Sequence, residues 1–232
     1  MSGVTSRTSA STHRDPGAAM DRIYKLQRHI YDATRKFFLF GRDGLIDSLR
    51  LAPDETLLEI GCGTARNLIL IARRYPGVRL LGVDASQQML DTAAASVRRA
   101  GLAGRITLAR GYAESLGVRD AFSIDRAPDR ILFSYALSMI PPWRAAMEHA
   151  LTTVKPGGSI HIVDFWDQAG LPRWFRWMLT RWIALFDVHY RPELMEYLGS
   201  LEREGRARVL IQPVGGRYAF RAVIRPGSAG GA

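Results

Sequence analysis

A glycine-rich turn between an apolar run and an amphipathic run is the clearest chemical signal in the chain. In LLEIGCGTARN the expected strand ends at Ile60, glycines follow at positions 61 and 63, and a helix is expected to begin near Thr64. Glycines at such a turn let backbone amides approach a ligand closely, and a helix N-terminus favours negative charge. The next expected strand closes on Asp84, at the spacing of a ribose-binding carboxylate in Rossmann-type folds. The pattern predicts a site for a nucleoside-containing cofactor.

Two kinds of cofactor compete for this turn. A dinucleotide requires a third glycine in G-x-G-x-x-G, and Arg66 occupies that position. S-adenosylmethionine carries no phosphate and does not require it. The E-x-G-x-G form, with Glu59 before the first glycine, resembles the first motif of the class I S-adenosylmethionine-dependent methyltransferases. VDAS, GYAES and VKPGGSIHIVD, later in the chain, resemble further motifs of the same family. The alternative is a Rossmann-like domain that does not bind this cofactor.

The resemblance implies S-adenosylmethionine as cofactor, S-adenosylhomocysteine as product, and a set of cofactor-binding residues. That set is Glu59, Gly61, Cys62, Gly63, Asp84, Ala85, Ser86, Met89, Ala113, Glu114 and Ser134. The two glycines would pass beneath the methionine part, with Glu59 near its amino group and Asp84 on the ribose hydroxyls. Tyr112 departs from the pattern, because many relatives carry Asp there. We interpret Cys62 as a small loop residue, since no base partner for a nucleophile is evident.

The acceptor is expected beside the cofactor, because ligands of open α/β sheets bind outside the carboxyl ends of the strands. The fourth expected strand, DRILFS, and the fifth, GSIHIVDF, place the following candidates there: Ser134, Tyr135, Ser138, Met139, Pro141, Pro142, Trp143, Asp164, Phe165 and Trp166. Among these we predict Ser134, Asp164 and Trp166 to bind substrate. The alternative for Phe165 and Trp166 is packing between a helix and the sheet.

An aromatic and basic stripe precedes the glycine turn, in YKLQRHIYDATRKFFLFGRDGLI. At helical spacing Tyr24, Arg28, Tyr31 and Arg35 share one face. Such a face suits a ligand with a carboxylate and an ammonium centre, because arginine binds the first bidentately and tyrosine rings attract the second. The alternative is a solvated basic face with two partly buried tyrosines.

A second resemblance concerns this stripe. The runs MDRIYKLQRHIYDATRKFFLFGRDGLI and FSYALSMIPPW are similar to the bacterial betaine-lipid N-methyltransferases, over most of the chain from Met20. Those enzymes methylate diacylglyceryl-homoserine to diacylglyceryl-trimethylhomoserine. The resemblance implies the same reaction here, with a lipid substrate at an anionic membrane surface and an upstream enzyme that transfers homoserine.

Methyl transfer from a sulfonium is an in-line displacement in which the enzyme mainly positions and desolvates the acceptor. Our hypothesis is that Tyr24, Tyr31 and Tyr135 line the pocket of the methylated nitrogen. Arg28 or Arg35 would hold the homoserine carboxylate. The proton of the amine could pass to Tyr31, His29, Asp164 or water, and the sequence leaves this open. No metal site is predicted.

A tryptophan-rich stretch, LPRWFRWMLTRWIALF, follows the fifth expected strand. On a helix beginning near Pro172, one side would carry Trp174, Trp177, Met178, Trp182 and Leu185, and another would carry Arg173, Arg176 and Thr180. Such a helix can lie in a membrane interface. The alternative is a helix that caps the active site and is buried against the sheet.

The elements that must position these residues alternate along the chain. Strands are expected in TLLEI, VRLLGV, RITLA, DRILFS, GSIHIVDF, RVLIQPV and YAFRAVI, with amphipathic helices between the first five. This order predicts an α/β fold with a Rossmann-like, doubly wound, seven-stranded sheet, mostly parallel. The last two runs are separated by GGR, which predicts an antiparallel C-terminal hairpin. We expect a disordered tail at 1–19, a helical cap at 20–54, a methyltransferase domain at 55–226 and a second tail at 227–232.

Composition limits the class of protein and its partners. The net charge of +10 favours an anionic partner, either an acidic membrane surface or nucleic acid, and the lipid resemblance favours the membrane. The single cysteine excludes an internal disulfide, and no apolar run approaches the roughly 20 residues that span a bilayer. The N-terminus lacks the apolar region of a secretory signal. We therefore expect a cytoplasmic, peripherally membrane-associated enzyme whose oligomeric state the sequence does not predict.

Three other functions stay open at this stage. A methyltransferase could act on phosphatidylethanolamine, a quinone or another small molecule. A methyltransferase that acts on RNA would use the same basic surface. A domain that binds the cofactor without catalysis would share the glycine turn.

Overall fold

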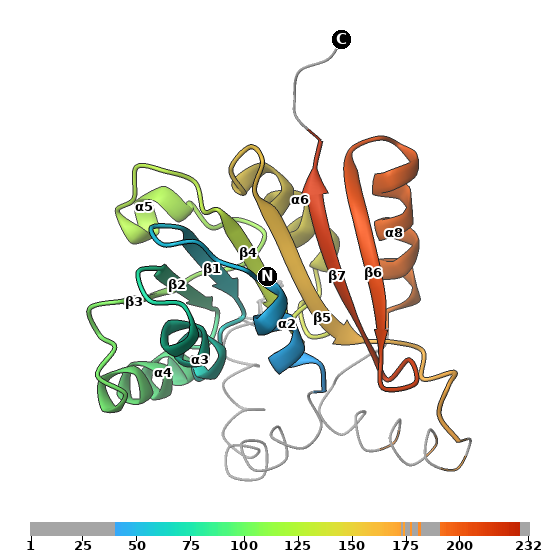
Figure 1. The fold of residues 1–232 in the computed structure, drawn as a ribbon, viewed down its shortest axis with the longest axis horizontal. Helices are drawn as coiled ribbons and strands as arrows, with labels where there is room; N and C mark the ends of the chain where they lie inside the picture. Colours follow the sequence, from blue (N-terminus) through green and yellow to red (C-terminus); the bar gives the residue numbers. More distant parts are fainter. Residues whose placement is uncertain (1–39, 173, 175–176, 178–180, 182–190, 228–232) are drawn as a thin grey trace, which may run out of the picture.

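The computed structural model describes residues 40–172, 174, 177, 181 and 191–227. Seven strands form one sheet in the order β3-β2-β1-β4-β5-β7-β6 (Figure 1). The strands are β1 (Thr56–Ile60), β2 (Arg79–Asp84), β3 (Ile106–Arg110), β4 (Arg130–Ser134), β5 (Ser159–Phe165), β6 (Ala207–Val214) and β7 (Ala219–Pro226). Strands β1 to β5 pair in parallel, and β7 pairs antiparallel with both β5 and β6. The predicted fold class, including the C-terminal hairpin, is confirmed.

Burial explains why the sequences of the central strands are continuously apolar and that of the edge strand is not. All seven residues of β5 are buried, because helices cover both faces of that strand. In β6 partly buried and exposed positions alternate along most of the strand, as expected at an edge with one solvated face. None of the helices in the described part of the chain is long and apolar enough to cross a membrane.

Six described helices cover the sheet: α2 (Arg42–Ser48), α3 (Arg66–Arg74), α4 (Gln87–Arg99), α5 (Val118–Phe122), α6 (Trp143–Thr153) and α8 (Pro192–Arg203). Helices α2, α3 and α4 contribute to the hydrophobic cluster on one face of the sheet. Helices α5, α6 and α8 contribute to the cluster on the other face. The sheet is therefore covered from both sides, as a doubly wound fold requires.

The strand register brings the carboxyl ends of four strands to one edge of the sheet. Ile60 at the end of β1 lies between Val83 of β2 and Phe133 of β4, and Ser134 pairs with Val163 of β5. Loops from the glycine turn and from the ends of β2, β4 and β5 consequently meet at this edge. We call it the carboxyl edge.

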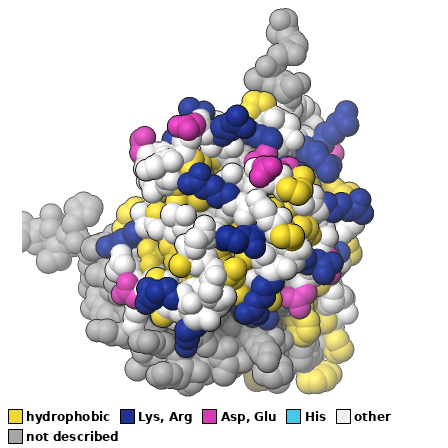
Figure 2. Space-filling view, turned by 60° about the vertical axis from the view of Figure 1, so that its left-hand side comes forward, with side chains coloured by type: hydrophobic (Ala, Val, Ile, Leu, Met, Phe, Trp, Pro, Cys, Tyr) yellow, Lys and Arg dark blue, Asp and Glu magenta, His cyan; other side chains and the backbone are white. Residues whose placement is uncertain are grey.

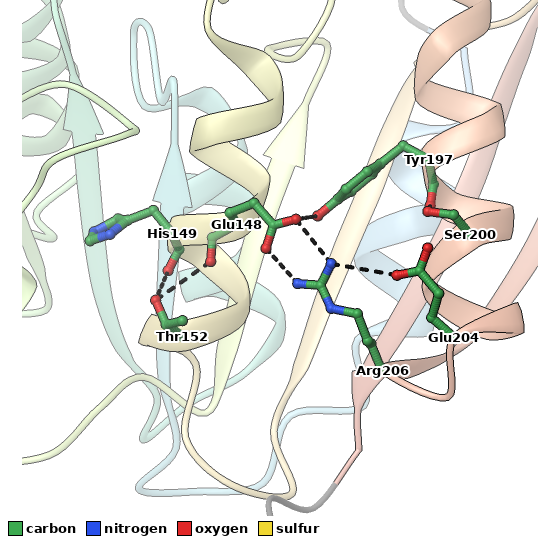
Figure 3. A network of polar contacts seen from close by, with 7 residues as sticks. All are labelled: Glu148, His149, Thr152, Tyr197, Ser200, Glu204 and Arg206. Atoms are coloured by element: carbon green, nitrogen blue, oxygen red, sulfur yellow. Dashed lines mark hydrogen bonds and ion pairs between the residues drawn. The ribbon is translucent and has the colours of Figure 1, made fainter.

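A polar network lies at the opposite edge and joins α6, α8 and the start of β6 (Figure 3). The Tyr197 hydroxyl of α8 donates a hydrogen bond of 2.8 Å to Glu148 of α6. The guanidinium of Arg206, which precedes β6, bonds both oxygens of the same carboxylate. Helix α8 was not among the elements expected from the sequence, although Pro192 in its first turn and the apolar spacing of PELMEYLGSL are typical helix signals.

Most of the N-terminal prediction lies outside the described residues. The tail at 1–19, the greater part of the cap at 20–54 and residues 228–232 are among them, so these boundaries stay predictions. The described part of the cap is its end, where Phe40 and Gly41 lead into α2. The sheet itself runs from Thr56 to Pro226.

Candidate functional site

The glycine turn after β1 is held close to its neighbours. The backbone N–H groups of Gly61 and Cys62 both donate to the carbonyl of Val83, each at 2.9 Å. Gly61 has a φ of +72°, and a Cβ at this position would lie 2.9 Å from the Cβ of Ala136, in the loop after β4. A residue with a side chain would be strained here both by its backbone and by the contact. The glycine therefore lets the loops after β1 and β4 approach each other.

Asp84, at the end of β2, links two loops of the carboxyl edge. Its carboxylate accepts a hydrogen bond of 2.8 Å from the backbone of Gly63 and one of 2.9 Å from the backbone of Ser86. The residue is partly exposed, unlike the four strand residues before it. A partly exposed carboxylate between these loops can also accept hydrogen bonds from a ligand, and its role on the ribose stays a prediction.

Glu59 lies beneath the turn, with 1 % of its surface exposed. The side-chain amide of Asn67, in the first turn of α3, donates a hydrogen bond of 2.7 Å to Glu59 Oε1. A buried carboxylate needs such a partner, because burial without hydrogen bonds is costly. Sequence reasoning missed Asn67. The available signal was its position on the expected helix, directly after the glycine turn.

The loops after β2 and β3 also meet at this edge. Ser86 is the N-cap of α4, where its hydroxyl accepts from the backbone of Met89 at 3.4 Å. The Arg110 side chain donates to the carbonyl of Ala85 at 3.1 Å. Ala113 is buried, Glu114 is partly buried and Tyr112 is 41 % exposed. The structure thus brings together the residues of the predicted adenine side.

On the acceptor side, Asp164 is a buried anchor. Its two carboxylate oxygens accept hydrogen bonds from the backbone of Ser138 at 3.0 Å and of Phe165 at 2.8 Å. Burial raises the pKa of Asp164 to about 6. This carboxylate ties the loop after β4 to the end of β5, and its 1 % exposure places it beneath the surface of the site. The sequence predicted it to bind substrate.

Tyr135 lies in an aromatic cluster formed by Phe40, Tyr135, Phe165 and Tyr218. Its hydroxyl donates a hydrogen bond of 2.6 Å to the carbonyl of Phe40, and burial raises its pKa well above the usual range. The ring centres of Tyr135 and Phe165 are 4.7 Å apart, and those of Phe40 and Tyr218 are 5.3 Å apart. The tyrosine predicted to line the pocket of the methylated nitrogen is therefore bonded through its hydroxyl to Phe40, two residues before α2.

The remaining acceptor candidates divide into packed and polar residues. Phe165 and Trp166 both pack against the β6–β7 hairpin. The Phe165 ring centre lies 5.7 Å from that of Tyr218, and the Trp166 ring centre lies 6.1 Å from that of Phe220, with the Arg217 guanidinium 4.6 Å from the same indole. Ser134 is buried at the end of β4, level with Gly61, and its hydroxyl has no hydrogen-bond partner among the described residues. Ser134 therefore lies where the glycine turn and the end of β4 meet.

Two further residues at this edge were missed by sequence reasoning. Phe40 supplies the carbonyl that binds Tyr135, and Arg42, only 7 % exposed, carries a positive charge that acts on the same tyrosine. Both belong to the quoted N-terminal run, in FGRDG, but the predicted aromatic and basic stripe ends at Arg35. The predicted residues Tyr24, Arg28, His29, Tyr31 and Arg35 lie outside the described residues, and their roles stay predictions.

The residues of the cofactor side fit S-adenosylmethionine. The carboxylates of Glu59 and Asp84 are suited to an ammonium group and to ribose hydroxyls. Arg66, at the position of the third glycine in dinucleotide sites, begins α3 with its side chain exposed. In the part of the chain that the structure describes, no group of three or more His, Cys, Asp or Glu residues could hold a metal ion.

Comparison with known proteins gives the same cofactor class. Residues 57–158 match a family model described as a methyltransferase domain. The chain is 30 % identical over 176 residues to trans-aconitate 2-methyltransferase of Pseudomonas paraeruginosa, covering 75 % of this chain and 54 % of that protein. It is 28 % identical over 197 residues to the ubiquinone/menaquinone biosynthesis C-methyltransferase UbiE of Syntrophotalea carbinolica, covering 75 % and 80 %. The chain thus spans about half the length of the first relative and four-fifths of the second.

Among solved structures, a SAM-dependent methyltransferase from Aquifex aeolicus is similar, with a TM-score of 0.61 and 18 % identity. The match covers 88 % of this chain and 96 % of that one. At this identity the likeness concerns the fold. It includes the sheet whose carboxyl edge carries the glycine turn.

Proposed function

We propose that this chain, which carries a class I S-adenosylmethionine-dependent methyltransferase domain and uses that cofactor, N-methylates the amino group of a lipid-borne acceptor, with diacylglyceryl-homoserine as the first candidate. The proposal is supported by the resemblance of the N-terminal run to betaine-lipid N-methyltransferases. It is also supported by the kind of side chains that the acceptor side presents.

The observation that carries the proposal is the aromatic cluster beside the glycine turn. Tyr135 directly precedes Ala136, the residue whose Cβ a side chain at position 61 would meet. The ring centre of Phe165, at the end of β5, lies 4.7 Å from that of Tyr135. The polar groups nearby, Asp164 and the Tyr135 hydroxyl, are bonded to the backbone. Aromatic faces tolerate an increasingly methylated, cationic nitrogen better than a fixed carboxylate does, because they attract it without a proton.

The chain's own residues would act mainly by positioning. When bound, the cofactor supplies an activated methyl group on a sulfonium. Asp84 and the loops that it joins would orient the nucleoside part, and Glu59 would orient the amino-acid part. The cluster around Tyr135 would exclude water from the acceptor nitrogen. Because Asp164 and Tyr135 are engaged in backbone hydrogen bonds, the proton of the amine is expected to leave to water rather than to either side chain.

A second candidate is methylation of a quinone ring carbon. The observation in its favour is the similarity to the quinone C-methyltransferase UbiE, which extends over four-fifths of that protein. A quinone is also a membrane lipid with a polar head, so the same aromatic wall would suit it. The two candidates differ in the acceptor atom, nitrogen against carbon.

The test is a panel of acceptors with purified protein and methyl-labelled cofactor. Diacylglyceryl-homoserine, phosphatidylethanolamine, a demethylated quinone, trans-aconitate and RNA are offered in detergent micelles or buffer, and products are identified by mass spectrometry. We expect one to three methyl groups on the homoserine nitrogen, and none with Asp84→Asn, which weakens cofactor binding. Label on the quinone carbon would replace the first candidate with the second. Binding of S-adenosylhomocysteine without any labelled product would contradict both.

A further inference from the structure

We propose that Trp174, Trp177 and Arg181 form a docking surface for an anionic lipid bilayer. We call these three residues the Trp-Arg surface. The inference extends the proposed function and rests on it in one respect, which is that the methyl acceptor comes from the bilayer. The physical contact with lipid can be tested separately.

The exposure of the two tryptophans is the first observation. Trp174 is 69 % exposed and Trp177 is 65 % exposed, whereas Trp143 of α6 is 8 % exposed. Indole side chains are seldom this exposed to water unless they contact a partner or a membrane. The sequence left open whether this stretch caps the site or faces a membrane, and these exposures favour the second alternative.

The spacing of the three residues is the second observation. Residues 174, 177 and 181 are all helical, and steps of three and four residues place them on one side of a helix. The Arg181 guanidinium lies 5.3 Å from the ring centre of Trp177. A stripe of indoles beside a stacked guanidinium matches the depth of a membrane interface, where indole rings lie at headgroup level and cations reach the phosphates.

The position of the surface relative to the site is the third observation. The backbone of Gly170, after β5, donates to the carbonyl of Gly216 at 3.1 Å, which fixes the chain to the β6–β7 hairpin. Trp174 follows four residues later, so its Cα lies within about 14 Å of the Cα of Gly170. The hairpin and the end of β5 lie at the carboxyl edge, where α2 also begins (Figure 1). Phe40, 55 % exposed, lies at the same edge.

Charge favours an anionic bilayer as the occupant. The chain carries a net charge of +10, and the Arg181 guanidinium places one cation on the Trp-Arg surface itself. Further Lys and Arg side chains, with acidic side chains among them, are spread over the face on the β3 side, at the other end of the sheet from the β6–β7 hairpin (Figure 2). A positive charge distributed in this way attracts an extended anionic surface over a Debye length, and the exposed indoles then fix the orientation. A lipid acceptor in that bilayer would meet the enzyme at the edge that carries the glycine turn.

The experiment measures binding of the whole chain to phosphatidylcholine vesicles with and without phosphatidylglycerol, by co-sedimentation and tryptophan fluorescence. We expect binding to the anionic vesicles with a blue shift of the emission. The variant Trp174→Ser/Trp177→Ser should lower partitioning roughly tenfold or more, because two apolar side chains no longer enter the interface. Arg181→Gln should lower it about fivefold and Leu210→Ser, at an exposed position on β6, should leave it unchanged.

Several outcomes would overturn the proposal. One is equal vesicle binding by the double tryptophan variant and the unaltered chain, and another is no vesicle binding at all. If the double tryptophan variant still bound vesicles but had a lower molar mass in light scattering than the unaltered chain, the surface would instead be a contact with a second copy of the chain. Thermal melting and S-adenosylhomocysteine binding verify that each variant is folded. If the double variant methylates its acceptor normally in micelles but slowly in vesicles, docking and the proposed reaction are both supported. Vesicle binding without methylation of any lipid would leave the docking surface and remove the proposed function.

Discussion

Asp84 and Asp164 both lie at the carboxyl edge of the sheet, and each accepts two backbone hydrogen bonds. Asp84 is the last residue of β2, and Asp164 is the next-to-last residue of β5. Asp84 is partly exposed and joins the loops after β1 and β2. Asp164 is 1 % exposed and joins the loop after β4 to the end of β5, and its pKa rises to about 6 on burial. Similar hydrogen bonds therefore hold a partly exposed carboxylate on one side of the edge and a buried anchor on the other.

The difference between the two carboxylates indicates which side chains can determine substrate specificity. On the cofactor side, Asp84 holds two loops and is still partly exposed. On the acceptor side, Asp164 and the Tyr135 hydroxyl are bonded to the backbone, and the rings of Tyr135 and Phe165 are buried against each other. We therefore expect the acceptor to be selected by the shape of its site more than by a dedicated base.

The largest effect is expected on the cofactor side, from Gly61→Ala. A φ of +72° costs an alanine about 1–2 kcal/mol, and the contact with Ala136 adds strain of about 1–3 kcal/mol. The free energy of unfolding should fall by the sum, and affinity for S-adenosylhomocysteine should fall with it. Urea unfolding and calorimetric titration measure the two quantities.

The double variant Gly61→Ala/Ala136→Gly separates the two causes. It removes the Cβ that the new alanine would meet, so the contact strain should disappear while the backbone strain persists. Stability should recover partly. No recovery would mean that the close approach of the two loops is not what the glycine provides.

The next largest effect concerns the pH dependence of stability on the acceptor side. The pKa of Asp164 is raised from 3.8 to about 6 by burial. Its favourable contribution to the free energy of unfolding is therefore complete below about pH 3.8 and is lost as the pH rises through about 6. The contribution that is lost is about 3 kcal/mol in order of magnitude. Asp164→Asn should remove this slope from urea unfolding measured between pH 4 and pH 7.

His161 of β5 provides the control of opposite sign. Burial lowers its pKa from 6.5 to about 4. Its contribution is present above about pH 6.5 and is lost as the pH falls through about 4, again about 3 kcal/mol in order of magnitude. The two slopes nearly cancel in the unaltered chain. In the Asp164→Asn variant, lowering the pH should decrease the free energy of unfolding more than in the unaltered chain. In the His161→Gln variant, lowering the pH should increase it. Identical pH profiles for both variants would contradict the burial of one of the groups.

The placement of the cofactor-side residues could be predicted from the sequence more fully than the contacts of the acceptor-side residues, for a physical reason. Glycines, a strand-closing acid and a helix start are local signals, so the placement of Gly61 and Asp84 follows from a few consecutive residues, and their roles toward a cofactor stay predictions. The sheet order follows from alternation of strands and helices. By contrast, the contact of Tyr135 with Phe40 joins residues 95 positions apart. Nothing near either residue distinguishes a buried anchor from a pocket wall, and the same holds for Asp164.

A smaller effect is expected from Tyr135→Phe. The variant loses the 2.6 Å hydrogen bond to the Phe40 carbonyl, which should lower stability by about 1 kcal/mol, with turnover retained. Tyr75→Phe is a matched control, because the Tyr75 hydroxyl donates to the carbonyl of Ile46 in α2 at 2.8 Å, away from the acceptor side. A large loss of turnover in the first variant, with unchanged stability, would make Tyr135 a catalytic residue.

The smallest effect is expected at the opposite edge of the sheet, from Arg206→Ala. The Glu148–Arg206 pair joins α6 to β6 with both side chains about two-fifths exposed (41 % and 42 %), so its loss should cost less than about 1 kcal/mol. Affinity for S-adenosylhomocysteine and turnover should not change, because Arg206 precedes β6 at the amino end of the strands. This variant measures how much any small loss of stability disturbs the site. If it weakened cofactor binding, the effects at Gly61 and Tyr135 would reflect the stability of the whole domain, and the contrast between the two sides of the carboxyl edge would lose its basis.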